Sequence, residues 1–162
     1  MKDYDLLNAF IELYWLRPEN GIVKYFQSES WLDIKWQGKS IDISTADGMY
    51  VFLHCGGRFN PKFDFFIDTK SSEFNHDKFV DIYDTFTNKF NPIISTKPNK
   101  NINVGTDWKN GLLSKAKKLN FFNETILHDN NNMPFPFEDS EFEFIHSNSL
   151  YWTKNAPKLL KE

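Results

Sequence analysis

The sequence is poor in cysteine and has no long apolar run. Its 162 residues include a single cysteine, Cys55, so no disulfide can form within the chain, and this composition suits a reducing compartment. No stretch reaches the ~20 consecutive apolar residues of a membrane span. The N-terminal MKDYDLLNAF lacks the apolar segment of a signal peptide. We therefore expect a cytoplasmic protein, with Cys55 as a small buried apolar residue.

Excess positive charge is also absent. The formal net charge is -3 at pH 7. Nucleic-acid-binding domains usually present a basic face, and proteins that bind anionic membranes carry clusters of lysine and arginine. We therefore expect neither nucleic acid nor a membrane as a partner.

Apolar and aromatic residues are plentiful. They make up 40% and 17% of the chain, and 17 residues are phenylalanine. A chain of this length buries roughly 70% of the surface that it exposes when unfolded, which is enough for one domain with a real core. We therefore expect a single domain over residues 1–162.

The first hundred residues indicate helices, one short strand and an insertion. Apolar residues at helical spacing predict helices within 1–31. Residues 40–43 predict a strand, and a helix over 48–55 is expected to stop at Gly56-Gly57. Residues 58–101 form an aromatic-rich insertion in which the spacing of Phe79, Tyr83, Phe86 and Phe90 predicts a buried helical face, and residues 91–101 predict a loop.

From residue 102 onward, strands and helices alternate. Residues 102–107, 124–127 and 142–147 predict strands, and a last helix starts near 156. Residues 108–119 predict a helix that buries Trp108, Leu112, Ala116 and Leu119 and ends at Asn120. This alternation predicts an α/β fold: a Rossmann-like parallel sheet of about four strands with flanking helices.

Polar residues follow each predicted strand. They are the turn from Asp42 to Gly48, then Asp107, Asp129, and finally Ser147-Asn148-Ser149. In a parallel sheet, ligands bind outside the carboxyl ends of the strands. We therefore expect these groups to converge on one rim of the sheet.

The segments VGTDWKNGLLSKAKKL and LHDNNNMPFPFEDSEFEFIHSNSLYW contain motifs in a recognisable order. A strand-end acid is followed by a helix, a second strand-end acid, a Pro-Phe segment with Asp-Ser-x-Phe, and a strand ending near Ser-Asn. This order resembles class I S-adenosylmethionine-dependent methyltransferases. The matching residues are Asp107, Asp129, Pro136-Phe137, Asp139 to Phe142, and Ser147-Asn148.

The resemblance implies a site for S-adenosylmethionine. Asp107 would accept the ribose hydroxyls, Asp129 would contact the adenine, and Ser147 and Asn148 would lie near the methionine end or the substrate. Asp42, Asp47 and Gly48 would form the cofactor turn. The alternatives are structural: Asp107 as a helix N-cap, Asp47 and Asp129 as turn residues, and Ser147 and Asn148 as caps.

The chain departs from the family pattern in its turn and in its spacing. Ser44 and Ala46 stand where the family usually has glycine. Asp107 also lies farther than the usual ~20 residues from the turn. Asp68 is nearer that spacing, but Asp107 is the better candidate because the helix and the next acid follow it.

The family sheet continues with about three more strands, for which only ten residues remain after Trp152. We therefore expect a sheet that is truncated relative to the seven-stranded fold. A homo-oligomer or a partner chain would then cover its open edge.

The resemblance implies methyl transfer to an unidentified small-molecule or macromolecular acceptor. The sequence names no general base, for which His128 and His146 are only candidates, and it indicates no metal site. Tyr151 and Trp152 either border the methyl group or pack in the core. Two other interpretations remain open: an inactive methyltransferase-like interaction protein, and an aromatic-rich binding module with an exposed apolar patch.

Overall fold

A computed structural model describes residues 4–14, 17–69, 83–150 and 153–161 of the chain. The chain divides into two compact units. The first unit comprises residues 1–34 and 49–101, and the second comprises residues 35–48 and 102–162. The predicted insertion, 58–101, therefore belongs to the same unit as the N-terminal helices.

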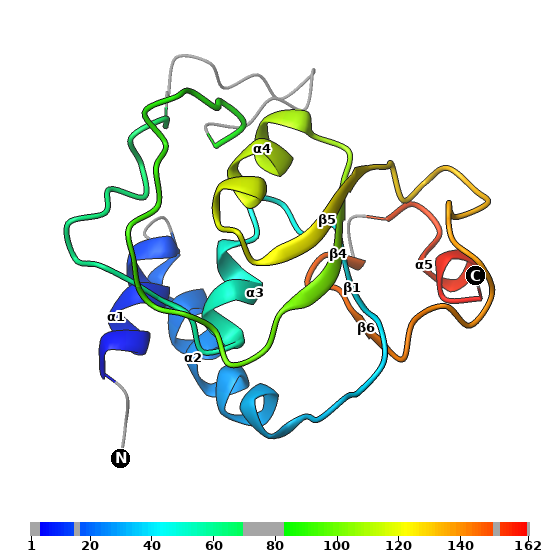
Figure 1. Cartoon of the computed structure of the whole chain (residues 1–162), viewed down its shortest axis with the longest axis horizontal. Helices are drawn as coiled ribbons and strands as arrows, with labels where there is room; N and C mark the ends of the chain where they lie inside the picture. Colours follow the sequence, from blue (N-terminus) through cyan, green and yellow to red (C-terminus); the bar gives the residue numbers. More distant parts are fainter. Residues whose placement is uncertain (1–3, 15–16, 70–82, 151–152, 162) are drawn as a thin grey trace. The chain divides into compact units, whose positions relative to one another are not determined.

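The second unit is built on a four-stranded parallel sheet (Figure 1). Its strands are β1 (Ser40–Ile43), β4 (Ile102–Asp107), β5 (Phe122–Leu127) and β6 (Phe144–His146), in the spatial order β5-β4-β1-β6. Every pair of neighbouring strands is parallel. The predicted α/β fold with a parallel sheet is confirmed.

The strand order reverses at β1. The chain adds β4 and then β5 on one side of β1, and afterwards returns to place β6 on the other side. In this register Asp42 lies opposite Gly105 of β4 and opposite His146 of β6. The carboxyl ends of β1 and β6 therefore flank the topological switch point, where sheets of this kind bind their ligands.

One face of this sheet is covered by apolar side chains. Ile41, Ile43 and Val104 form a buried cluster with Leu159 of helix α5 (Ala156–Leu159). The phenylalanines of the 135–142 segment pack against the same cluster. Phe137 and Phe142 meet edge to face, with ring centroids 4.9 Å apart. The Pro-Phe and Asp-Ser-x-Phe motifs therefore contribute core residues to this face.

Helix α4 (Asn110–Lys118) packs against β4 and β5. Leu112, Ala116 and Leu119 are buried, as predicted, and Asn120 adopts the left-handed conformation of a helix C-terminus, with φ 49°. Trp108 was expected to be buried but is 50% exposed. The helix begins only at Asn110, so Trp108 precedes it and does not share its buried face.

The first unit contains helices α1 (Tyr4–Leu13), α2 (Pro18–Asp33) and α3 (Met49–His54). The predicted N-terminal helices and the helix before Gly56 are confirmed, and Gly56 has a φ of 88°. Phe10, Phe52 and Cys55 are buried. Ile22, Val23 and Phe26 of α2 are exposed because a different side of the helix, with Tyr25 and Ser28, faces inward.

The segment 58–101 differs from its prediction. Strands β2 (Arg58–Phe59) and β3 (Ile94–Thr96) form an antiparallel pair, although a loop was expected over 91–101. The helix expected through Tyr83, Phe86 and Phe90 is absent over 83–90, and Phe79 lies outside the described residues. Phe90 is nevertheless buried, because it packs edge to face on Phe63 from irregular backbone.

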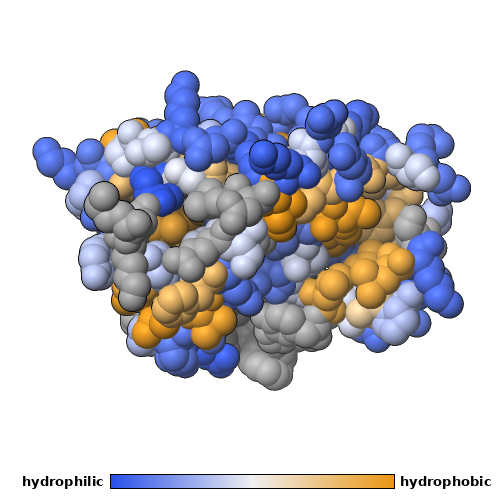
Figure 2. Space-filling view, turned by 90° about the horizontal axis from the view of Figure 1, so that it is seen from below, coloured by the Kyte–Doolittle hydropathy of each residue, from blue (hydrophilic) through white to orange (hydrophobic). Residues whose placement is uncertain are grey.

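Within the described residues, no helix is both long enough and apolar enough to span a bilayer. The face in Figure 2 shows apolar side chains in several separate groups among hydrophilic ones. This surface is not uniformly polar, so the interpretation as an aromatic-rich binding module stays open.

Candidate functional site

The turn after β1 contains three left-handed residues at alternating positions. The φ angles are 59° for Ser44, 54° for Ala46 and 75° for Gly48. Residues with a Cβ rarely adopt this backbone conformation, because it costs them roughly 1–2 kcal/mol each. The turn therefore keeps a backbone suited to glycine at two positions where the sequence has serine and alanine.

Gly48 closes this turn, and its backbone N–H donates to the carbonyl oxygen of Thr45 at 2.9 Å. A Cβ on Gly48 would lie 2.6 Å from Cε2 of Phe122. Both the positive φ and this close approach require glycine here. The predicted importance of Gly48 thus has a structural basis that is independent of any ligand.

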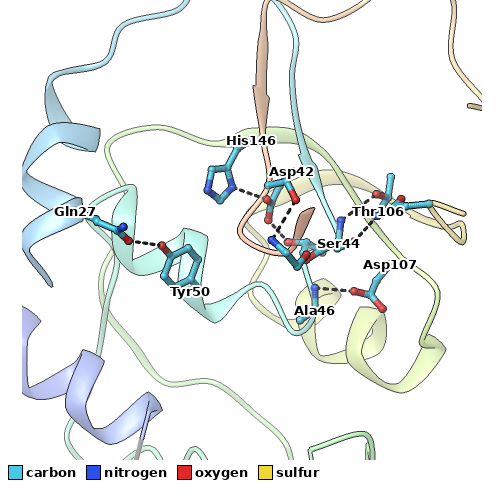
Figure 3. A network of polar contacts seen from close by, with 12 residues as sticks. Gln27, Asp42, Ser44, Ala46, Tyr50, Thr106, Asp107 and His146 are labelled. Carbon is cyan, nitrogen blue, oxygen red and sulfur yellow. Dashed lines mark hydrogen bonds and ion pairs between the residues drawn. The ribbon is translucent and has the colours of Figure 1, made fainter. Parts of the chain in front are cut away.

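Asp42 is a buried acid at the end of β1 (Figure 3). Its Oδ1 lies 2.6 Å from Nδ1 of His146 at the end of β6. Its Oδ2 accepts a hydrogen bond from the hydroxyl of Thr45. Both carboxylate oxygens are therefore paired, which compensates for removing the acid from water.

Asp107 connects the end of β4 to the same turn (Figure 3). Its Oδ2 accepts from the backbone N–H of Ala46 at 3.0 Å, and its Oδ1 accepts from the backbone N–H of Lys109 at 2.9 Å. The predicted alternative role as N-cap is wrong, because Lys109 occupies the N-cap position of α4. Asp107 instead bonds the amide of that residue.

Burial dominates the electrostatics of Asp107. It raises the pKa of the carboxyl above its usual value of 3.8, because the charged form loses hydration. The amide hydrogen bonds from Lys109 and Ala46 and the charge of Lys109 lower the pKa and offset part of this effect. Keeping this buried carboxylate ionised therefore costs folding free energy, which marks Asp107 as a candidate functional group.

Residues after β5 reach the turn through Asn130. Its Nδ2 donates to the hydroxyl oxygen of Ser44, and the backbone N–H of His128 donates to the carbonyl oxygen of Asp107 at 2.9 Å. Asp129 lies between them and is half-buried. Its Oδ1 accepts from the backbone and side-chain nitrogens of Asn131, at 2.9 and 2.8 Å. One oxygen of Asp129 is thus engaged in its own turn.

The end of β6 closes the rim on the other side of β1. The Oγ of Ser149 donates to the carbonyl oxygen of Ser44 at 3.4 Å, and the Oγ of Ser147 accepts from the backbone N–H of Ser149 at 3.3 Å. Asn148 and Asp47 are half-buried. Tyr151 and Trp152, proposed to border the methyl group, lie outside the described residues.

The carboxyl ends of all four strands therefore meet at one turn. Asp42, Asp107 and Gly48 were predicted here, and each contacts the turn or belongs to it. Two further side chains were not predicted here: Thr45, whose hydroxyl bonds Asp42, and Asn130, which bonds Ser44. His146 was predicted only as a candidate base. Asn130 is the first of three consecutive asparagines, a pattern typical of an exposed loop, so nothing in the sequence indicated that its side chain is buried.

Asp68, the acid whose spacing from the turn is nearer the family pattern, belongs to the first unit. Its carboxylate accepts from the backbone N–H of Thr87 at 2.7 Å and from the hydroxyl of the same residue. This buried acid thus joins two segments within the aromatic insertion that are 19 residues apart in the chain.

In the part of the chain that the structure describes, no three His, Cys, Asp or Glu side chains are grouped as metal ligands would be. Comparisons of the chain with protein-family models, curated proteins and solved structures find no match. The candidate site therefore depends on its own geometry.

Proposed function

We propose that the second unit binds S-adenosylmethionine and transfers its methyl group to a small-molecule or macromolecular acceptor. The observation that carries this proposal is the turn after Asp42, in which Ser44, Ala46 and Gly48 alternate in left-handed conformation at the switch point of a parallel sheet. Such turns let a ligand approach the main chain closely.

The residues present fit an adenosyl group. The Asp107 carboxylate accepts amide hydrogens from Ala46 and Lys109 and keeps lone-pair capacity that can accept a ribose hydroxyl. Asp129 at the end of β5 would take the exocyclic amine of the adenine. Among the described residues, the buried Oδ1 of Asn130 has no hydrogen-bond partner, so the rim retains an unused acceptor.

Methyl transfer from S-adenosylmethionine would require little from the protein beyond binding and orientation. S-adenosylmethionine supplies an activated methyl group on a sulfonium. Asp42, Asp107 and the turn would fix its orientation, and Ser147 and Asn148 would lie beside its methionine end. Rate acceleration would then come from holding the acceptor in line with the methyl group and from excluding water.

Isothermal titration calorimetry with S-adenosylmethionine and S-adenosylhomocysteine tests the proposal. We expect micromolar binding by the wild-type chain and at least tenfold weaker binding by Asp107→Asn, because a carboxylate hydrogen bond contributes roughly 1.5–3 kcal/mol. Asp139→Asn is the matched control, because this exposed acid of the same unit lies in the loop before β6 and should leave affinity unchanged. Absent or millimolar binding by the wild-type chain would refute the proposal.

The turn also supports a second candidate, a methyltransferase-like domain without catalytic activity. Ser44 and Ala46 add side-chain atoms where close approach favours glycine, and the hydroxyl of Ser44 is already bonded to Asn130. This candidate predicts weak binding that increases at least tenfold in Ser44→Gly/Ala46→Gly. An unchanged affinity in that double variant would count against it.

A further inference from the structure

We propose that Asp42 and His146 form a proton-accepting dyad, in which Nε2 of His146 takes the proton of the methyl acceptor. This inference deepens the proposed function and depends on it. The two residues come from strands far apart in sequence, and only the return of the chain to place β6 beside β1 brings them together.

The dyad is held by the sheet itself. Asp42 and His146 are direct partners in the parallel register of β1 and β6. Asp42 Oδ1 and His146 Nδ1 are 2.6 Å apart, which is a short and therefore strong hydrogen bond. Thr45 donates to the second oxygen of Asp42 and so fixes the carboxylate from the other side.

This arrangement selects one tautomer of the imidazole. A carboxylate can only accept hydrogen bonds, so Nδ1 of His146 must carry the hydrogen that it shares with Asp42. The neutral ring then keeps an unprotonated Nε2, which is the form that can accept a proton. The same logic operates in catalytic triads, where a buried aspartate holds a histidine in the tautomer needed for base catalysis.

Exposure separates the roles of the two side chains. The Asp42 side chain is 4% exposed, whereas that of His146 is 13% exposed. His146 also ends β6 and precedes Ser147 and Asn148, the residues proposed to lie near the methionine end. In the proposed arrangement the imidazole faces the ligand at the switch point, and Asp42 acts behind it as a positioning residue.

The proposed step transfers a methyl group to the acceptor and a proton to His146. The acceptor's oxygen or nitrogen uses a lone pair to form a bond to the methyl carbon. The methyl–sulfur bond breaks, and its electron pair passes to the sulfur, which becomes a neutral thioether. The acceptor's proton moves to Nε2 of His146, and the carboxylate of Asp42 stabilises the resulting imidazolium until the proton is released to water.

The tautomer can be measured without any acceptor. In the ¹⁵N-labelled chain, long-range ¹H–¹⁵N spectra distinguish protonated from unprotonated ring nitrogens in each of the four histidines. His146→Asn identifies the His146 signals by their loss and keeps a side-chain donor that can reach Asp42. We expect the neutral ring of His146 to show Nδ1–H with an unprotonated Nε2, and Asp42→Asn to shift the population toward Nε2–H. A neutral Nε2–H form in the wild-type protein would overturn the dyad.

A second experiment titrates the labelled protein with S-adenosylhomocysteine, which keeps the adenosyl group and lacks the methyl group. We expect this ligand to shift the Nε2 and Cε1–H signals of His146. Binding without any shift at His146 would overturn the catalytic placement while leaving the proposed function intact. No binding by a wild-type chain with the expected tautomer would overturn the proposed function, and with it the methyl-transfer step.

Discussion

Asp42 and His146 lie opposite each other on neighbouring parallel strands, with Oδ1 and Nδ1 2.6 Å apart. The pair joins the two strands that flank the switch point, and the hydroxyl of Thr45 completes the pairing of the carboxylate. Because the pair is buried, losing this hydrogen bond should reduce both the stability of the protein and the proposed proton transfer.

A double-mutant cycle with Asp42→Ala and His146→Ala measures this contact. Each single substitution leaves a buried polar partner unsatisfied and should lower the free energy of unfolding by roughly 1–3 kcal/mol. The double variant should lose less than the sum of the two, with a coupling of about 1–3 kcal/mol. Urea unfolding provides the values. A control cycle combines His146→Ala with Lys39→Ala. Lys39 is exposed and precedes the first residue of β1, so the two effects should be additive. Additivity between Asp42 and His146 would contradict the direct interaction.

The charge of Asp107 should make stability depend on pH in a defined direction. Because its pKa is raised in the folded state, the folded chain binds this proton more tightly than the unfolded chain does. The associated stability is present below the usual value of 3.8 and is lost as the pH rises through the raised pKa. The free energy of unfolding of wild type minus that of Asp107→Asn should therefore fall between about pH 3 and neutrality. Chemical denaturation across this range checks the sign, and a difference that grows with pH would contradict the role of burial.

Ala46→Gly should stabilise the protein. The left-handed φ of 54° penalises alanine by roughly 1–2 kcal/mol, and the greater freedom of glycine in the unfolded chain offsets part of the gain. We expect a net increase of about 0.5–1 kcal/mol in the free energy of unfolding. Ala116→Gly is the matched control, because the same change inside α4 should destabilise by about 1 kcal/mol or more. Destabilisation by Ala46→Gly would mean that the turn is not strained.

Gly48→Ala should destabilise the protein by roughly 1–3 kcal/mol. The new methyl group would meet Phe122 at 2.6 Å and Leu119 at 3.2 Å, and the φ of 75° would add strain. Thermal unfolding checks the loss. Gly38→Ala should cost less, because its backbone is not left-handed and the new Cβ would meet only the side chain of Glu143. Equal losses at the two positions would argue against the special geometry of Gly48.

Local patterns carried much of the prediction. Short apolar runs ending in polar residues located β1, β4, β5 and β6, and their alternation with helices indicated a parallel sheet. Helical spacing located the buried side of α4 at Leu112 and Ala116. The error at Trp108 arose because helical periodicity does not show where a helix begins.

Helical spacing gave a wrong prediction in the aromatic insertion. Phe86 and Phe90 have helical spacing, but they lie on irregular backbone, and Phe90 is buried through Phe63. Strand β3 was missed because its pairing with β2 is a contact between segments distant in the chain. Spacing alone cannot distinguish a helical stripe from aromatic side chains gathered by tertiary packing.

The sequence by itself determined the succession of elements in the second unit, the parallel class of its sheet and the presence of acids at the strand ends, because these follow from local propensity and from the geometry of crossover connections. The tertiary structure alone decided the order β5-β4-β1-β6, and with it the pairing of Asp42 with His146. It also decided that Ser44 and Ala46 adopt left-handed conformations. Contacts from Asp107 and Asn130 stabilise that turn, and they lie too far along the chain for any local pattern to reveal them.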